Sequence, residues 1–163
     1  MAECCTVNQP LAVASAVMNC PVSGTRSKQV NLLTLKSLVR HLKFGMPAAQ
    51  YYFCAAPDCD AVYFPSTPDA PTFSRDDLLV RVGAKEAGEE ATICYCFGIS
   101  RSQIREEVEA AGRCSAAEKI KAEIQAGRCA CEVKNPSGKC CLGDVTRAVL
   151  EVLRSSRSAL DKG

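Results

Sequence analysis

The chain lacks the features that favour binding to nucleic acid or insertion into a membrane. Its 20 Lys and Arg residues are nearly balanced by 18 Asp and Glu, and the net charge of +2 is not gathered into any Lys/Arg-rich run. No broad positive field therefore attracts nucleic acid. The apolar run near the N-terminus, residues 11–18, is too short to span a bilayer. We expect neither nucleic acid as a partner nor membrane insertion.

Patterns typical of common enzymes are also missing. The chain has a single histidine, His41, which stands between the basic residues Arg40 and Lys43 and is interpreted as a surface residue. We find no Ser–His–Asp set, no paired carboxylates in a catalytic context and no glycine-rich loop that would hold a phosphate. Hydrolysis and phosphoryl transfer are therefore not expected.

Cysteine, by contrast, is abundant, with 12 residues in a chain of 163. Chains this rich in cysteine are either secreted disulfide scaffolds or intracellular metal proteins. No basic segment precedes the apolar run, as it would in an export signal, and Glu3 is acidic. We therefore expect a cytoplasmic, reducing location, where closely spaced thiols bind metal rather than form disulfides.

Six cysteines of the second half fall into two clumps. The first is Cys94-Tyr95-Cys96, and the second lies in the loop 128–141, with Cys129, Cys131, Cys140 and Cys141. Residues 135–138, Asn-Pro-Ser-Gly, have the composition of a turn that brings the ends of this loop together. Four thiolates can hold a [2Fe–2S] cluster, and zinc is the alternative.

The first half has a second group of thiols. Residues 51–64 predict a β-hairpin with Cys54 and Cys59 on either side of its tip, and Cys20 lies in a turn made by residues 20–24. Three thiolates from two such elements are typical of a zinc site. A fourth ligand is not evident, because Ser23 is a poor zinc ligand. The candidates are Asp60, Cys4, Cys5, His41, water or an incoming thiophilic ion.

Hydrophobic periodicity predicts an α+β protein of two small domains. The expected order is an arm over residues 1–19, a hairpin-and-helix subdomain over 20–83, a linker over 84–92, a mostly helical subdomain over 93–154 and a tail over 155–163. In the first subdomain a helix begins near Asn31 or Thr34 and continues to Leu42, and a short strand covers 78–82. In the second, Ser100 is the expected N-cap of the first helix.

Three stretches carry a resemblance to a known family. Residues 81–86 (RVGAKE), 93–96 (ICYC) and 131–141 (CEVKNPSGKCC) are similar to the N-terminal domain of CopZ-type copper chaperones. The resemblance extends from about residue 20 to residue 150. The second half also resembles, more loosely, the bacterioferritin-associated ferredoxins. The fold that these resemblances imply is a small zinc-binding β-hairpin and helix followed by a mostly helical [2Fe–2S] domain.

The resemblance to CopZ also implies ligands. Carried over onto this sequence, the cluster ligands are Cys94, Cys96, Cys131 and one of the Cys140–Cys141 pair, of which we choose Cys141 because it stands at a predicted helix start. Cys129 has no counterpart in the motif and is, with Cys140, an alternate ligand. The implied zinc ligands are Cys20, Cys54 and Cys59. Where the family has CPxC this chain has Ser23, which leaves the fourth zinc ligand open. Cys114 is interpreted as a structural residue or free thiol.

The function implied is metal trafficking by one-electron transfer. In the family such a domain is joined to a copper-binding domain with a Met-x-Cys-x-x-Cys loop, and this sequence has no such motif. We therefore expect a redox module, rather than an enzyme in the usual sense, that reduces a thiophilic metal ion or hands it on, copper foremost. Its partners would be the metal ion, an electron donor and a separate copper carrier protein or metal transporter. The alternatives are a non-catalytic cluster carrier or redox sensor, a ferredoxin-like partner, and a mercury-handling protein.

Overall fold

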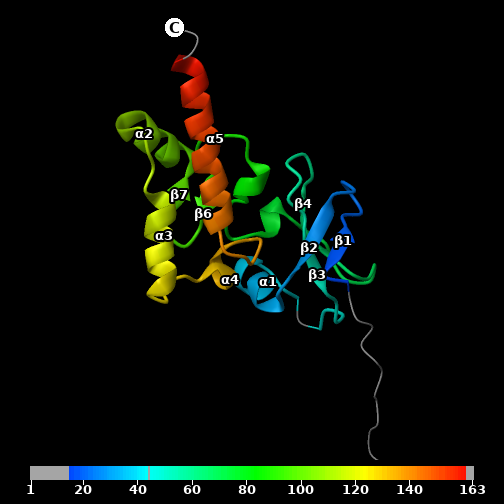
Figure 1. Cartoon of the computed structure of the whole chain (residues 1–163). Coiled ribbons are helices and arrows are strands. Elements are labelled where there is room, and N and C mark those ends of the chain that lie inside the picture. Colours follow the sequence, from blue (N-terminus) through cyan, green and yellow to red (C-terminus); the bar gives the residue numbers. More distant parts are fainter. Residues whose placement is uncertain (1–14, 44, 161–163) are drawn as a thin grey trace, which may run out of the picture.

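The first half of the chain forms one five-stranded antiparallel sheet with a short helix beside it. The computed structural model describes residues 15–43 and 45–160. The strands lie in sequence order, β1-β2-β3-β4-β5, and every neighbouring pair is antiparallel. Figure 1 shows the sheet and α1. Their bounds are β1 Val17–Asn19, β2 Arg26–Val30, α1 Leu32–Leu38, β3 Tyr51–Phe53, β4 Ala61–Pro65 and β5 Phe73–Ser74.

The hairpin expected over residues 51–64 is confirmed as β3 and β4. Tyr51 lies opposite Pro65 and Phe53 opposite Tyr63, so Cys54 and Cys59 both fall in the connecting loop. Aromatic residues favour strands, and the Ala-Pro-Asp sequence between them favours a turn. The strands β1 and β2 were not predicted, because β1, VMN, is only three residues long and β2, RSKQV, is mostly polar.

The sheet separates two small cores. One contains Leu35 of α1 with Val62 and Tyr63 of β4, which are fully buried. The other contains Tyr52 and Phe64, whose stacked rings lie 5.5 Å apart between centroids, together with Cys20, Cys54 and Cys59. Since Tyr51 and Tyr52 are neighbours on one strand, they point to opposite faces and join different cores. Burial of these aromatic side chains gives the small sheet its stability.

The second half is a hairpin followed by helices, which confirms the α+β class. Two strands pair as a hairpin, and helices follow. In Figure 1 the last helix, α5, lies beside α2 and α3. Ser100 caps α2 as expected, because its hydroxyl accepts a hydrogen bond from the amide of Gln103 and its own amide donates to the Gln103 side chain. The bounds are β6 Thr92–Cys94, β7 Ile99–Ser100, α2 Arg101–Ala111, α3 Ala116–Gln125, α4 Cys131–Lys134 and α5 Leu142–Leu160.

Several expected boundaries are wrong. Helix α1 ends at Leu38 rather than at residue 42, because Val39 leaves the helix to pair with Leu78 in an isolated β-bridge. Apart from that bridge, residues 78–82 form no strand. Helix α5 continues to Leu160. Among the described residues no helix is both long and apolar enough to cross a bilayer.

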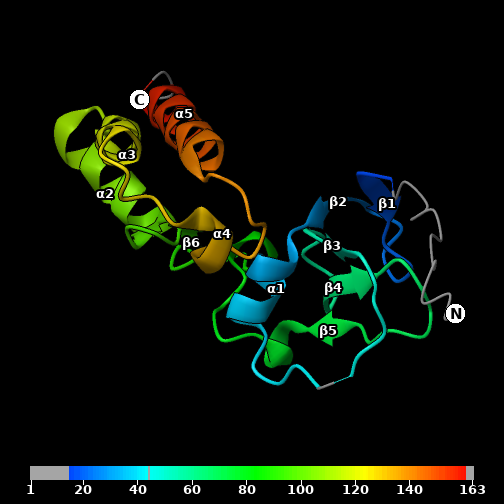
Figure 2. The same ribbon diagram turned by 90° about the horizontal axis from the view of Figure 1, so that it is seen from below.

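The two halves pack against each other through the cysteine-rich loop. Figure 2 shows α4 lying beside α1, where the sheet meets the helices. The buried hydroxyl of Tyr63 on β4 donates a 2.6 Å hydrogen bond to the carbonyl of Pro136 in the Asn-Pro-Ser-Gly turn. Gly138 of the same turn faces α1 so closely that a Cβ there would lie 2.8 Å from the Oγ1 atom of buried Thr34. The turn is therefore fixed by the first half of the chain.

The segment expected to be a linker, residues 84–92, is anchored to both halves. It opens with a short 3-10 helix, η2, Gly83–Lys85. Lys85 is 4% exposed, and its ammonium donates hydrogen bonds of 2.8 Å to the carbonyls of Ala56 and Cys59 in the β3–β4 loop. At the other end of η2, the amide of Gly83 donates to the hydroxyl of Tyr95, which lies between Cys94 and Cys96. The domain division itself stays a prediction.

The contact at Gly138 predicts a matched pair of substitutions. Gly138 and Gly127 both have a positive φ, 67° and 70°, but a Cβ at Gly127 would meet nothing within 4 Å. Gly127→Ala is expected to lower the free energy of unfolding by about 1–2 kcal/mol through backbone strain alone. Gly138→Ala adds the overlap with Thr34, roughly 1–3 kcal/mol more. Urea unfolding followed by circular dichroism measures both, and equal losses in the two variants would contradict this packing.

The buried ammonium of Lys85 gives a second prediction. Lys85→Met keeps the apolar stem but removes both charged hydrogen bonds to the β3–β4 loop. Charge-assisted hydrogen bonds contribute about 1.5–3 kcal/mol each when a buried partner is left behind, so we expect a loss of at least about 2 kcal/mol in the free energy of unfolding. Lys139→Met, at an exposed lysine, is the control and should change stability little. An unaltered stability of Lys85→Met would show that the loop does not depend on this ammonium.

Candidate metal centres

Three buried thiols of the first half meet at one point. Cys20 lies in the turn between β1 and β2, and Cys54 and Cys59 lie in the β3–β4 loop. Their sulfur atoms all lie within 4.8 Å of one another, and the Sγ atoms of Cys20 and Cys59 are 3.9 Å apart. Thiolates on one tetrahedral zinc ion lie roughly 3.8 Å apart, given a Zn–S distance of about 2.3 Å. The three side chains are therefore already placed for one such ion.

Ser23, rather than Asp60, faces this group. The Oγ atom of Ser23 lies 3.4 Å from the Sγ atom of Cys54, and Ser23 itself is exposed. The side chain of Asp60 is 75% exposed and pairs with Arg75 at 3.8 Å. His41 is also exposed and is not a member of the group. Cys4 and Cys5 lie outside the described residues.

Hydrogen bonding prepares Cys20 for a metal. Burial opposes ionisation of this thiol, but hydrogen bonds from the side chain and backbone of Ser23 outweigh burial and lower its pKa to about 7. For Cys59, burial is the largest effect and raises the pKa. Metal ions bind thiolates, so loading of this group releases protons.

The second half also brings together the sulfur atoms expected from the sequence. Cys94 ends β6, Cys96 lies in the β6–β7 turn, and Cys131 is the first residue of α4. The Sγ atoms of Cys96 and Cys131 are 3.5 Å apart. Cys141, which immediately precedes α5, is buried in the same core cluster as Cys94 and Cys131. The loop 128–141 thus turns back so that both of its ends reach the Cys94–Cys96 segment.

The turn of the loop is built around one buried asparagine. The Asn135 side-chain oxygen accepts hydrogen bonds from the amide and hydroxyl of Ser137, each 3.0 Å long. Its side-chain amide donates to the Lys139 carbonyl at 2.8 Å. These bonds close the turn between Cys131 and Cys141, as the Asn-Pro-Ser-Gly composition predicts.

Cys129 is a fifth member of this gathering. Its Sγ atom lies 3.3 Å from that of Cys131, and Cys96, Cys129 and Cys131 lie mutually within 4.8 Å. Cys140, the other alternate ligand, is exposed. Cys114 is part of neither group, because its thiol contacts the carboxylate of Glu107 at 3.3 Å. In the sequence, the Cys-x-Cys spacing of Cys129 and Cys131 indicated that Cys129 belongs to this group.

Neighbouring thiols of the second group shift one another's pKa. The adjacent Cys141 thiol lowers the pKa of Cys94 to about 6, and Cys94 raises the pKa of Cys141. The hydrogen bond with Cys131 lowers the pKa of Cys129, whereas burial is the main cause that raises the pKa of Cys131. The amide of Ala130 donates to the Cys96 sulfur at 3.3 Å. Part of the group is thus ready to act as thiolate ligands.

The donor set of the second group suits a soft metal centre. Every member is a cysteine, and its buried thiols, Cys94, Cys131 and Cys141, pack with Ile104, Ile120 and Val145. Soft thiolates in an apolar setting are what iron–sulfur clusters, zinc and Cu(I) require. Cys141 also stands at the start of α5, whose N-terminal amides favour negative charge. The residues present therefore fit a [2Fe–2S] cluster, although zinc would accept the same donors.

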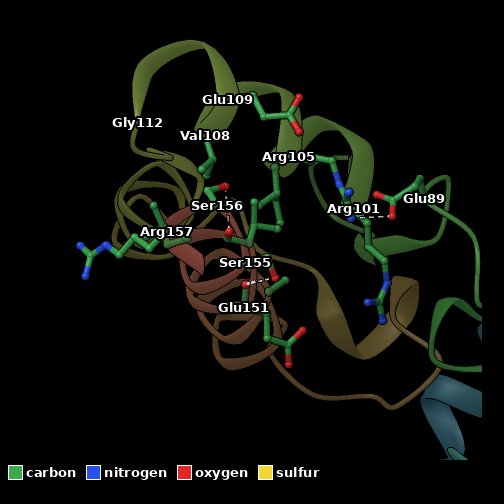
Figure 3. Close-up of a pocket in the computed structure, with 14 residues that line it drawn as sticks. Glu89, Arg101, Arg105, Val108, Glu109, Gly112, Glu151, Ser155, Ser156 and Arg157 are labelled. Carbon is green, nitrogen blue, oxygen red and sulfur yellow. Dashed lines mark hydrogen bonds and ion pairs between the residues drawn. The ribbon is translucent and has the colours of Figure 1, made fainter. Parts of the chain in front are cut away.

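A groove of the described structure lies apart from both thiol groups. It has a volume of about 820 Å³ and lies between α2 and α5, over Ile104, Val108 and Val152. Figure 3 shows its charged rim, in which Arg105 pairs with Glu89 at 2.8 Å. The hydroxyls of Ser155 and Ser156 turn back to carbonyls of α5. No cysteine lines the groove, so it is not part of either candidate metal centre.

Comparisons with known proteins agree with this architecture. Residues 17–79 match the model of a family described as a zinc binding domain. The copper chaperone CopZ of Archaeoglobus fulgidus is 33% identical over 126 residues, which make up 77% of this chain and 58% of that protein. The chain thus spans little more than half the length of this relative. The looser resemblance to bacterioferritin-associated ferredoxins stays a prediction.

A solved structure agrees with this match, and the matched region covers nearly all of that structure. The X-ray structure of the N-terminal domain of Archaeoglobus fulgidus CopZ matches with a TM-score of 0.62 and 33% identity. The match covers 80% of this chain and 96% of that domain. The resemblance expected from the sequence is thereby confirmed, and the chain belongs to the family of CopZ N-terminal domains.

Proposed function

We propose that this protein is a cytoplasmic metal-trafficking protein that transfers single electrons to a thiophilic metal ion, copper foremost. The observation that carries the proposal is the convergence of Cys94, Cys96, Cys131 and Cys141 from three separate segments. Membership of the CopZ family supports copper as the metal served, since the relative from Archaeoglobus fulgidus is named as a copper chaperone. The alternative, a zinc-only scaffold, would leave this second group without a redox role.

The second thiol group is proposed to hold a [2Fe–2S] cluster, which supplies a one-electron redox couple when bound. Cys94, Cys131 and Cys141 are buried and Cys96 is partly exposed, so the apolar side shields the centre and the Cys96 side opens to a partner. The Ala130 amide that donates to the Cys96 sulfur favours added negative charge and so raises the reduction potential. Cys140 is not used, because its side chain is exposed.

The first thiol group is proposed to hold one structural zinc ion through Cys20, Cys54 and Cys59. Support comes from the 3.9 Å separation of two of these sulfur atoms and from the match to a zinc binding domain family. Ser23 marks the open side of the group, so the fourth ligand there is water or an incoming donor. Asp60 is not favoured, because its carboxylate is exposed and paired with Arg75. Zinc here would hold the β3–β4 loop in place, together with the hydrogen bonds from Lys85 and the ion pair between Arg75 and Asp60.

In trafficking, the reduced protein would give one electron to Cu(II) and so produce Cu(I). Cu(I) is the soft ion that thiolate carriers accept. The proposed partners are therefore an electron donor upstream and a separate copper carrier protein or metal transporter downstream. The partly exposed Cys96 side is the surface from which an electron would leave.

Anaerobic mixing of the reduced protein with Cu(II) tests this function. We expect about one Cu(I) per cluster, detected with a Cu(I)-specific chelator, while the visible absorption returns to the oxidised form. Free thiols also reduce Cu(II), so the zinc-loaded Cys94→Ala variant, which is expected to lack the cluster, is the control for that background.

Three outcomes would contradict copper reduction by the cluster. Equal yields of Cu(I) from the Cys94→Ala control would assign the electrons to free thiols. A reduced cluster that is indifferent to Cu(II) would leave a cluster carrier, redox sensor or ferredoxin-like partner. Reaction with Hg(II) but not with copper would indicate mercury handling.

The proposed zinc site predicts that Ser23→Cys strengthens binding. The new thiolate would complete a four-cysteine site without moving the turn, because the Ser23 side chain already lies beside Cys54. Zinc should then pass to a chromogenic chelator at least about ten times more slowly than from the wild type. Ser23→Ala should change the rate by only a small factor, because the serine hydroxyl is a poor ligand. Equal rates for all three proteins would place the open position of the site elsewhere.

A further inference from the structure

We propose that Cys129 is a reserve ligand of the second metal centre, able to replace Cys131 on the same iron. This inference rests on the proposed [2Fe–2S] cluster and concerns which sulfur atoms hold it. A [2Fe–2S] cluster takes four protein ligands, yet five thiols meet here. The surplus thiol lies beside Cys131 rather than beside Cys94 or Cys141.

The five thiols are divided unequally. Cys94 and Cys141 are buried in one core cluster, and Cys140, the neighbour of Cys141, is exposed. On the other side, Cys96, Cys129 and Cys131 form a set of three whose sulfur atoms all lie within 4.8 Å of one another. The separation of Cys129 and Cys131, 3.3 Å between sulfur atoms, is even shorter than the 3.5 Å between Cys96 and Cys131. Among the described cysteines, therefore, only the three-membered side has a spare sulfur in position.

The backbone around Cys129 allows the exchange without unfolding. Cys129 lies in the three-residue link before α4, whereas Cys131 is the first residue of that helix and its carbonyl accepts from the Asn135 amide. The link is held at both ends. Arg128 forms two hydrogen bonds with the carboxylate of Glu123, and the Ala130 amide donates to the Cys96 sulfur. Since the Sγ atoms of Cys129 and Cys131 are only 3.3 Å apart, rotation of the Cys129 side chain would move its sulfur toward the position of the Cys131 sulfur.

The exchange is balanced in protons and electrons. Cys129 would bind the centre as a thiolate after losing its proton, and Cys131 would be released and take up a proton. One thiolate replaces another, so neither the charge of the centre nor its oxidation state changes. Cys129 is partly exposed and Cys131 is buried, so the exchange would bring the centre closer to solvent and alter its potential.

Alanine variants test the reserve role, because a serine hydroxyl could itself bind iron. After anaerobic reconstitution, Cys131→Ala should keep about half or more of the wild-type iron and acid-labile sulfide, with a changed visible circular dichroism spectrum. The double variant Cys129→Ala/Cys131→Ala should keep less than about a tenth. Cys114→Ala/Cys131→Ala is the matched control, since it also lacks two cysteines but retains Cys129, and it should resemble Cys131→Ala. Cys94→Ala, which has no spare sulfur beside it, should lose the iron.

Alkylation provides a second readout at the residue itself. Iodoacetamide should label Cys129 in the wild-type protein loaded with iron and sulfide, and Cys129 should become protected in Cys131→Ala. Zinc bound in the first thiol group reports that each variant has folded. The inference is overturned if Cys131→Ala loses iron as fully as Cys94→Ala, or if Cys129 remains open to alkylation in an iron-loaded Cys131→Ala. A wild-type protein without iron and sulfide would overturn the proposed function, and the reserve role with it.

Discussion

The hydrogen bond from the buried hydroxyl of Tyr63 to the carbonyl of Pro136 holds the cysteine-rich loop against the sheet. Beside it, the turn that contains Gly138 fits closely over Thr34 of α1. Within that turn, the Asn135 side chain forms hydrogen bonds with backbone and hydroxyl groups of the loop. Cys131 and Cys141 stand on either side of these contacts. The place of the second thiol group thus depends on packing by the first half of the chain.

The same coupling runs through the segment between the halves. The Lys85 ammonium donates a hydrogen bond to the carbonyl of Cys59. Gly83 lies so close to Thr92 that a Cβ there would be 1.9 Å from the Thr92 carbonyl oxygen, so only glycine fits. Tyr95 then binds back to this segment from between Cys94 and Cys96. One short stretch therefore positions a member of each thiol group, which makes the two centres parts of one structural unit.

Local signals were enough to predict much of this structure. The aromatic hairpin with cysteines at its tip, the cap at Ser100 and the turn at Asn135 each depend on neighbours in the sequence. The pairing of Val39 with Leu78 and the burial of Lys85 depend on contacts with residues distant in the sequence, and sequence spacing does not reveal these. The polar strand β2 was missed because its partners on both sides, rather than its composition, make it a strand.

The central claim is that thiols of the second half hold a [2Fe–2S] cluster in a domain whose first half holds zinc. Metal and acid-labile sulfide analysis of protein purified without oxygen, with an electron paramagnetic resonance spectrum after reduction, tests it most directly. The account predicts a red-brown protein with about two iron atoms, two sulfide ions and one zinc ion per chain, and a spectrum from one unpaired electron. A colourless protein that binds zinc alone, even when iron and sulfide are supplied, would contradict it.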